Sequence, residues 1–209
     1  LEVSYYGRIV EMRLSVIRKL RDLMASNALE KDLQQYIFEH LWLIDPSWER
    51  AKSTESMETG INNFLKTNTD NLSEKEKKGR IDIAYRTTAG KHVIIELKRP
   101  NVATPIDKLT AQIRKYRTGV QKILRTGEYS GWPIEIICLL GTPPPEWNEE
   151  NGQQEVSKSL ETLDARIVFY DQLVDSAEKA YSDYLVEYKN VDTLRGVFDS
   201  IDEFEGKSE

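Results

Sequence analysis

The sequence predicts an α/β fold in which a central mixed sheet is flanked by helices. Two stretches, 81–85 and 93–97, alternate apolar and polar residues with the period of a β-strand. A basic amphipathic helix is expected from about 106 to 125. The apolar run 134–140, which ends at a glycine, is typical of a strand buried on both faces.

Length and composition limit the class of protein. The 209 residues suit one compact domain with an accessory element, and 39% hydrophobic with 31% charged residues is ordinary for a globular chain. No apolar run reaches the roughly 20 residues that span a bilayer, so no membrane partner is expected. One cysteine, Cys138, and two histidines exclude a disulfide framework and zinc-finger ligand sets. Because the chain starts at Leu1 without a signal sequence, we expect a piece of a longer cytoplasmic protein, with an upstream domain in the same polypeptide.

The two period-two stretches are predicted to form an antiparallel hairpin, 81–85 with 93–97. A three-residue loop ending at Gly90 in the left-handed conformation would pair residues whose numbers sum to 178. Asp82 then lies directly opposite Glu96. Facing carboxylates repel and destabilise a sheet, whereas a divalent cation between them reverses the sign of that interaction. A two-residue loop would shift the register by one and separate the two acids.

The other elements are expected to surround this hairpin. Three segments are predicted: an N-terminal docking helix in 1–26, a main domain in 27–175 and an acidic helical extension in 176–209. The main domain's elements are a helix from Asn27 to before Asp45, a first strand near 48–53, a loop-rich insertion over 52–78, a rigid exposed loop at 142–147 and a last strand at 167–170.

Glu30 lies within the apolar stripe of the second helix, which includes Leu33, Ile37 and Leu41. One interpretation is a capping box, since Asn27 and Glu30 have the required spacing. The other is that this acid points into the polar pocket of the sheet. Both are compatible with the sequence.

Charge is unevenly distributed along a chain whose net charge is -6. The segment 98–125 has eight basic residues and one acid, whereas 146–209 has seventeen acids and six bases. The segregation indicates either solvated helix faces or a phosphate-facing stripe on an acidic body.

The motifs resemble a known family. Gly79-Arg80-Ile81-Asp82 followed by Val93-Ile94-Ile95-Glu96-Leu97-Lys98 has the Asp-x13-Glu-x-Lys pattern of the PD-(D/E)XK nuclease superfamily. The helix of Glu30 and the Gln112-x-x-x-Tyr116 helix resemble those of its NucS-like branch and of Shedu-type defence nucleases. The resemblance covers about 29–140 and implies a restriction-endonuclease-like αβββαβ core. Ile81 stands in place of the family's proline, and the insertion before Asp82 is longer than usual.

The resemblance implies a Mg²⁺-dependent endodeoxyribonuclease, with Mn²⁺ as a substitute, in a larger defence or repair protein. Its catalytic set would be Asp82, Glu96, Lys98, Glu30 and Gln112, and its metal ligands Asp82, Glu96, the Leu97 carbonyl and Glu30. Lys98 would position or deprotonate the attacking water or stabilise the phosphorane charge; the alternative for Lys98 is a salt bridge to Glu96. Tyr116 would pack under its helix or touch substrate. The implied contacts to nucleic acid are Arg99, Arg114, Lys115, Arg117 and Lys122.

Two other classes of function remain open. One is a catalytically silent module of the same fold that binds nucleic acid or a partner through its basic helix. The other is a structural assembly domain, including a homo-oligomer, built on the N-terminal helix and the acidic C-terminal third. Retention of Asp82, Glu96 and Lys98 favours catalysis, because a binding module has no need for two repelling acids.

Overall fold

The computed structural model describes residues 2–46, 48, 56–60, 80–87, 90–124, 131–182 and 186. The chain divides into two compact units, one of 22–173 and one that combines 1–21 with 174–209. The two ends of the chain therefore belong to one unit, where the sequence analysis treated them as separate elements.

The larger unit is built on a five-stranded mixed sheet in the order β1-β2-β3-β4-β5. The first two pairs, β1–β2 and β2–β3, are antiparallel, and β3–β4 and β4–β5 are parallel. This confirms the predicted α/β class with a mixed, helix-flanked sheet. The strands are β1 Ser56–Gly60, β2 Arg80–Arg86, β3 His92–Leu97, β4 Ile134–Leu140 and β5 Ala165–Phe169.

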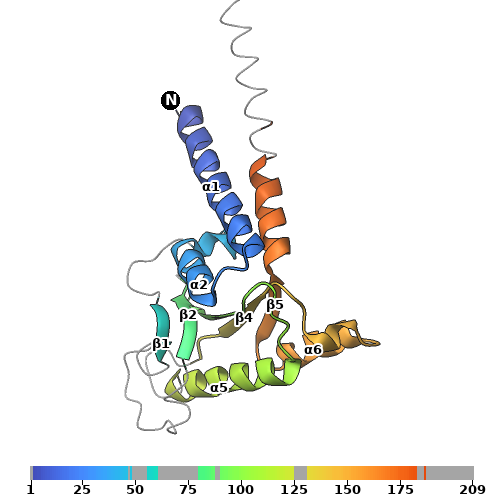
Figure 1. The fold of residues 1–209 in the computed structure, drawn as a ribbon. Helices are drawn as coiled ribbons and strands as arrows, with labels where there is room; N and C mark the ends of the chain where they lie inside the picture. The colour runs from blue at the N-terminus through green and yellow to red at the C-terminus, as the bar shows by residue number, and fades with distance from the viewer. Residues whose placement is uncertain are drawn as a thin grey trace, which may run out of the picture. The chain divides into compact units, whose positions relative to one another are not determined.

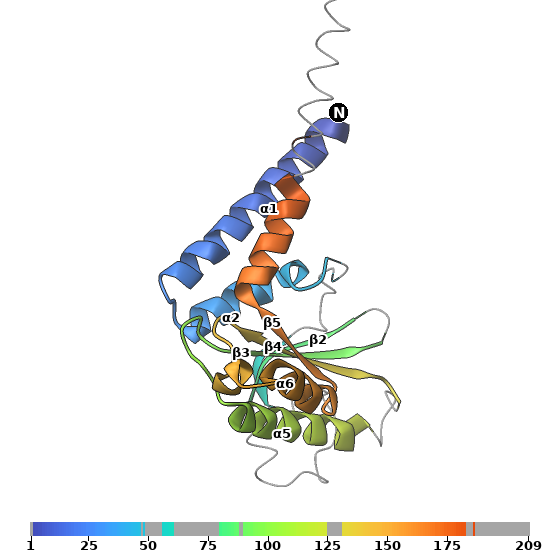
Figure 2. The ribbon, with the colours of Figure 1, turned by 90° about the vertical axis from the view of Figure 1, so that its right-hand side faces the viewer.

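Helices cover both faces of the sheet (Figures 1 and 2). Helix α5 (Ile106–Leu124) and helix α6 (Gly152–Glu161) lie on one face, and α2 (Glu30–Glu39) lies on the other. Apolar residues of β3 and β4 pack beneath α5 and α6 in one core. The members of this core that α5 and α6 contribute recur at helical spacing: Leu109, Ile113, Tyr116, Val120, Val156 and Leu160.

The predicted hairpin register is confirmed. The pairs Ile83–Ile95, Ala84–Ile94, Tyr85–Val93 and Arg86–His92 each sum to 178. The turn closes with Thr87 N–H donating to the Lys91 carbonyl at 2.9 Å, and Gly90 has the left-handed φ of +84°. A Cβ at Gly90 would also lie 3.1 Å from the Trp132 ring, so both backbone conformation and packing require glycine there. Thr88 and Ala89 lie outside the described residues.

The predicted role of Asn27 as the N-cap of the second helix is wrong. Helix α2 begins at Glu30 with Leu29 as its N-cap, and no side chain caps it. Asn27 instead has a left-handed φ of 48° just after α1 (Glu2–Ala25). Its N–H donates to the Met24 carbonyl and the Ala28 N–H to the Leu23 carbonyl, both at 2.9 Å, which is a Schellman motif. The capping-box interpretation of Glu30 is therefore excluded.

Other boundaries differ from the prediction. The second helix ends at Glu39 and is followed by a short 3₁₀ turn, η1 (Leu41–Leu43). The predicted first strand near 48–53 falls almost wholly outside the described residues. The first strand that the structure describes is Ser56–Gly60, inside the expected insertion, whose other residues, 52–55 and 61–78, also lie outside the described residues. The 142–147 loop contains the 3₁₀ turn η2 (Pro145–Asn148), and α6 was not predicted at all.

In the smaller unit, α1 and a helix over 170–182 lie side by side (Figures 1 and 2). Arg21 pairs with Asp175 at 2.8 Å and with Glu178 at 2.7 Å, and the Arg13 guanidinium donates to the Tyr181 hydroxyl. Asp175 and Glu178 therefore supply counter-charges to Arg21, and Tyr181 supplies a neutral acceptor to Arg13.

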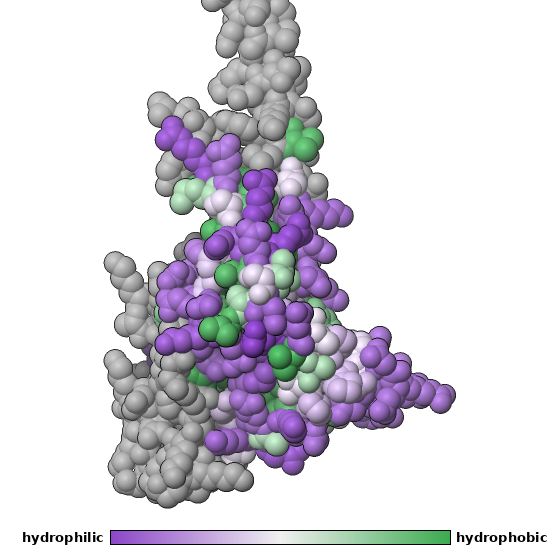
Figure 3. Space-filling view, in the orientation of Figure 1, coloured by the Kyte–Doolittle hydropathy of each residue, from purple (hydrophilic) through white to green (hydrophobic). Residues whose placement is uncertain are grey.

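The surface of the described part is mainly hydrophilic, as the purple residues in Figure 3 show for one face. The large apolar side chains exposed among the described residues are single ones: Met12, Leu29, Val102 and Val186. Within the described helices, none has both the length and the apolar character needed to cross a membrane.

Gly141, directly after β4, is expected to tolerate no side chain. A Cβ there would lie 2.4 Å from the Cα and the carbonyl oxygen of Pro100, a residue whose carbonyl already accepts a hydrogen bond from Thr142 Oγ1 at 2.7 Å. Gly141→Ala should lower the free energy of unfolding, measured by urea denaturation, by about 3 kcal/mol through overpacking.

Gly131→Ala is the matched control for this substitution. Gly131 has a φ of +85°, but nothing lies within 4 Å of an added Cβ. This variant should therefore lose only about 1 kcal/mol, from backbone strain alone. Equal losses in the two variants would contradict the close packing of Pro100 against the end of β4.

Candidate functional site

Polar side chains from two neighbouring strands meet at the carboxyl end of β3. Extending the observed hairpin register by one pair places Asp82 of β2 beside Glu96 of β3. Both lie on the face of the sheet that packs against α5, since Ala84 and Ile94 of the same parity belong to that core. Lys98, directly after β3, shares this face. The structure thus brings together the strand residues that the sequence singled out.

Glu96 is a buried carboxylate with unequal surroundings at its two oxygens. Its side chain is 1% exposed, and Oε1 accepts hydrogen bonds from Lys98 Nζ and, at 2.6 Å, from Gln112 Nε2. Oε2 is buried with no hydrogen-bond partner among the described residues. Burial and the nearby Asp82 carboxylate raise the pKa of Glu96 to about 7, although Lys98 opposes the shift.

Lys98 remains a cation in this setting. Burial alone lowers the pKa of the ammonium group, but Glu96, Glu30 and Asp82 outweigh burial, so the net pKa lies above its usual value. Lys98 is therefore expected to be charged at neutral pH and available to an anion.

Hydrogen bonds from neighbouring elements hold both the side chain and the backbone of Asp82. The Leu97 N–H donates to Asp82 Oδ2 at 2.9 Å, and Gln34 Nε2 donates to the Asp82 carbonyl at 2.5 Å. Gln34 is 3% exposed and was not singled out from the sequence. Its position four residues after Glu30, within the apolar stripe of α2, was the available signal, because a polar residue buried there needs a partner.

Glu30 reaches the same site from the first turn of α2. Its side chain is half-buried, and burial raises its pKa; Lys98 and Arg99 oppose the shift, and Asp82 adds to it. These charge interactions mean that Glu30 lies near Asp82 and Lys98. This position agrees with the second interpretation of the sequence, in which Glu30 points into the polar pocket of the sheet.

Gln112 and Tyr116 lie one turn apart on the buried side of α5. Gln112 Nε2 also donates to the Tyr116 hydroxyl at 2.8 Å, so one amide links the phenol to Glu96. Tyr116 is 3% exposed and packs in the core, and burial followed by the Glu96 charge raises its pKa. Tyr116 therefore has the position of a packing residue, the first of the two alternatives predicted for it.

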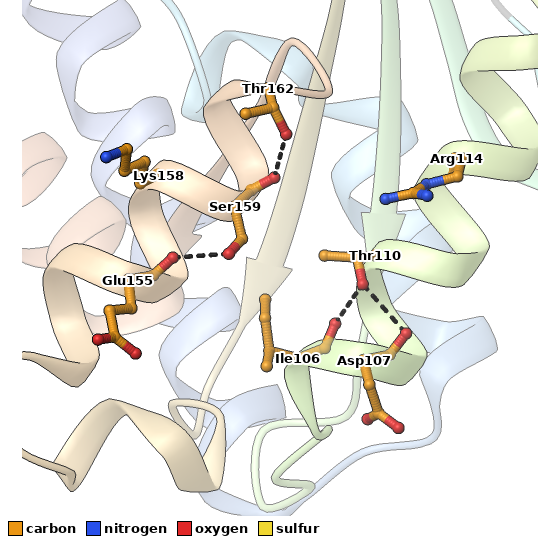
Figure 4. Close-up of a pocket in the computed structure, with 8 residues that line it drawn as sticks. All are labelled: Ile106, Asp107, Thr110, Arg114, Glu155, Lys158, Ser159 and Thr162. Atoms are coloured by element: carbon orange, nitrogen blue, oxygen red, sulfur yellow. Dashed lines mark hydrogen bonds between the residues drawn. The ribbon is translucent and has the colours of Figure 1, made fainter.

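The predicted phosphate contacts divide between two sides of α5. Arg117 Nε donates to Asp164 Oδ2 at 2.7 Å, after α6, and Arg114 lines a groove of about 540 Å³ between α5 and α6 (Figure 4). Lys115 lies three residues after Gln112 in α5, and Lys122 lies seven residues after Lys115. Helical spacing therefore puts both lysines on the same side of α5 as Gln112.

Arg99 is held by the connection between α1 and α2. Its guanidinium Nη2 donates to the Asn27 carbonyl at 2.8 Å. Asn27 Oδ1 also accepts from the Asn101 N–H at 3.4 Å. Arg99 therefore has a structural partner in addition to any contact with substrate.

The donor set fits a hard divalent cation. Within the described ranges, no group of three or more His, Cys, Asp or Glu residues is placed to hold a metal ion. Mg²⁺ is nevertheless commonly bound by one or two carboxylates, with waters and substrate phosphate oxygens completing the octahedron. Glu96 Oε2, which has no hydrogen-bond partner in the described part of the chain, and the neighbouring Asp82 carboxylate are such an incomplete ligand set.

Comparison with known proteins adds no family assignment. No protein-family model matches the chain, and no curated protein matches it. The resemblance described above therefore depends on the motif residues alone.

The titrations of Glu96 and His92 give opposite pH dependences of stability. Glu96 has a higher pKa folded than unfolded, so its contribution falls as pH rises from about 4.5 to about 7. His92 is buried at the other end of β3, and its burial, followed by the charge of Arg86, lowers its pKa to about 4. The contribution of His92 to the free energy of unfolding therefore rises between about pH 4 and 6.5. The two slopes should largely cancel in the wild type.

Glu96→Gln should expose the His92 slope. Measured by urea denaturation in EDTA, the stability of this variant relative to wild type should grow by up to about 3 kcal/mol from pH 4.5 to 7.5 and level off above. A difference in stability between Glu96→Gln and wild type that does not change with pH would contradict the raised pKa that burial gives Glu96.

Proposed function

We propose that the chain is a divalent-metal-dependent nuclease domain that hydrolyses phosphodiester bonds in DNA. One observation carries the proposal: a buried Glu96 carboxylate beside Asp82 that contacts Lys98 and Gln112 through Oε1, while Oε2 has no hydrogen-bond partner among the residues that the structure describes. A purely structural ion pair would leave neither a second acid alongside nor a buried oxygen unsatisfied.

The order of elements supports the same proposal. Helix α2 is followed by β1, β2 and β3, then by α5 and β4, which is the αβββαβ order expected of a restriction-endonuclease-like core. The acids and Lys98 lie where β2 begins and β3 ends, beneath α5. Because a fold alone does not determine activity, these side chains and not the order of elements support catalysis.

In the proposed reaction, Asp82 and Glu96, with the Leu97 carbonyl, would hold Mg²⁺ or Mn²⁺, and Glu30 would have to move closer to join them. A bound cation would lower the pKa of an attacking water and neutralise charge on the scissile phosphate. Lys98, in contact with Glu96, would donate hydrogen bonds to the water or to the phosphoryl oxygens. Gln112 orients the Glu96 carboxylate by occupying Oε1, which leaves Oε2 for the cation.

Lys98→Ala should abolish cutting of plasmid DNA. Supercoiled plasmid, linear duplex and single-stranded DNA are incubated with the protein in Mg²⁺, Mn²⁺ or EDTA. Wild type should cut only with metal, and the variant should lose at least about 100-fold in rate because a cation aimed at the phosphate is gone. Asp82→Asn should lose activity equally while keeping or gaining stability, because it removes like-charge repulsion.

Lys91→Ala is the control for these variants. Lys91 also belongs to the β2–β3 hairpin, but its ammonium pairs with Glu135 at 2.9 Å on the other end of the sheet. Its rate should equal that of wild type. Cutting by Lys98→Ala at the wild-type rate would disprove the site, and DNA binding without cutting by a folded wild type would favour the silent binding module instead.

Lys115 is expected to contact a phosphate, whereas Arg117 is not. Each phosphate contact adds roughly 0.9 to the slope of log affinity against log salt for duplex DNA. Lys115→Ala should therefore lower that slope by about 1, measured by fluorescence anisotropy with catalytically inactive Asp82→Asn protein. Arg117→Ala should leave the slope unchanged, because Asp164 already neutralises Arg117. The reverse pattern would place DNA on the α6 side of α5.

A further inference from the structure

Tyr170 is a buried side chain whose hydroxyl has no evident structural use. It follows β5 directly, is 0% exposed, and its hydroxyl has no hydrogen-bond partner within the part of the chain that the structure describes. Buried polar groups in native proteins are nearly always hydrogen-bonded, so a phenol buried without a partner requires an explanation.

The topology places Tyr170 at the end of the sheet where the candidate site lies. Val168 pairs with Leu139 and Leu139 with Leu97, so these three residues lie in one row across β5, β4 and β3. Tyr170 follows Phe169, the last residue of β5, and begins the helix over 170–182 just beyond this row. Glu30, the first residue of α2, is one of the two charges that act on the Tyr170 hydroxyl, and Asp82 is the other.

Glu30 lacks donors that its surroundings could supply. Among the described residues, no hydrogen bond to its carboxylate is present, although burial raises its pKa and the charges of Lys98, Asp82 and Arg99 act on it. Within the same part of the chain, Arg99 Nε, like the Tyr170 hydroxyl, is buried without a hydrogen-bond partner. Two buried groups able to donate and one carboxylate without a donor therefore occur at the same end of the sheet.

We propose that Tyr170 is a positioning residue whose hydroxyl donates to the Glu30 carboxylate and, together with Arg99 Nε–H, holds it toward a cation bound by Asp82 and Glu96. This inference rests on the proposed function, since it assigns a role at the same site. It also accounts for the two buried groups that lack partners, because both gain an acceptor when Glu30 is drawn to the cation.

The chemistry of the phenol suits a permanent donor. Burial, followed by the charges of Glu30 and Asp82, raises the pKa of Tyr170, so the hydroxyl keeps its proton at any pH at which the site would act. A hydrogen bond from a neutral donor to a ligating carboxylate fixes its orientation, and loss of such a partner typically lowers metal affinity by about 10-fold or more.

The test is a double-mutant cycle between Tyr170→Phe and Glu30→Gln in the full chain. Calorimetry measures Mn²⁺ affinity of wild type, each single variant and the double variant, and DNA cleavage by wild type is measured beside it. Tyr170→Phe should lower affinity about 10-fold, Glu30→Gln should lower it at least as much, and the double variant should match Glu30→Gln. Without metal, Tyr170→Phe should melt at or above the wild-type temperature, because it removes an unsatisfied hydroxyl.

A spectroscopic readout and a matched control complete the design. Titration of wild type with Mn²⁺ should produce a tyrosine ultraviolet difference spectrum that Tyr170→Phe loses. Tyr85→Phe removes another buried hydroxyl, on β2, and should keep both the spectrum and the affinity.

The outcomes separate this inference from the proposed function. Wild type that binds Mn²⁺ and cuts DNA, with an unchanged Tyr170→Phe, overturns the role of Tyr170 and leaves the nuclease proposal standing. If Tyr170→Phe lowers the Mn²⁺ affinity of the Glu30→Gln variant as much as it lowers that of wild type, the proposal that Tyr170 acts through Glu30 is overturned. Wild type that neither binds Mn²⁺ nor cuts DNA overturns both.

Discussion

The β2–β3 register is the constraint on which the site depends. The turn at Gly90 has an odd length, so Asp82 and Glu96 lie side by side on the face covered by α5 rather than on opposite faces. Two acids in that position cost free energy, and Glu96 is almost fully buried, which adds a desolvation penalty of several kcal/mol. The structure compensates with Lys98, Gln112 and the Leu97 N–H, each of which comes from an element that must already be in place.

Because the compensating groups come from different elements, the site connects them. Helix α5 contributes Gln112, and α2 contributes Gln34, whose amide holds the Asp82 carbonyl from the opposite face of the sheet. The loop after β3 packs on Gly141 at the end of β4, so the backbone that follows Lys98 cannot move independently of the parallel strands. Catalytic geometry that must hold to a fraction of an ångström is best supported by such rigid neighbours.

The sequence was sufficient for features governed by short-range periodicity. Strand alternation and a glycine in the turn determined the register, and β4 was predicted with its observed ends. Features that depend on tertiary context were not accessible. Asn27 suits an N-cap and a left-handed C-terminal position equally well, and only the chain path after α1 decides between them. β1 is a short polar edge strand. Gln34 lies within the apolar stripe of α2, but the group that its amide holds, the Asp82 carbonyl, follows only from the packing of the helix on the sheet.

Lys98 links the resting arrangement to the proposed chemistry. In the structure its ammonium is the counter-ion of Glu96, the same carboxylate that a divalent cation would neutralise. Under the proposed function, Lys98 and a cation held by Glu96 would compete for the same carboxylate, and the ammonium would then be available to another anion. A residue whose pKa stays high because three carboxylates surround it keeps its charge throughout. Without metal, the Lys98 ammonium makes the burial of Glu96 tolerable. Under the proposed function, the same ammonium would face the scissile phosphate when a metal ion is bound.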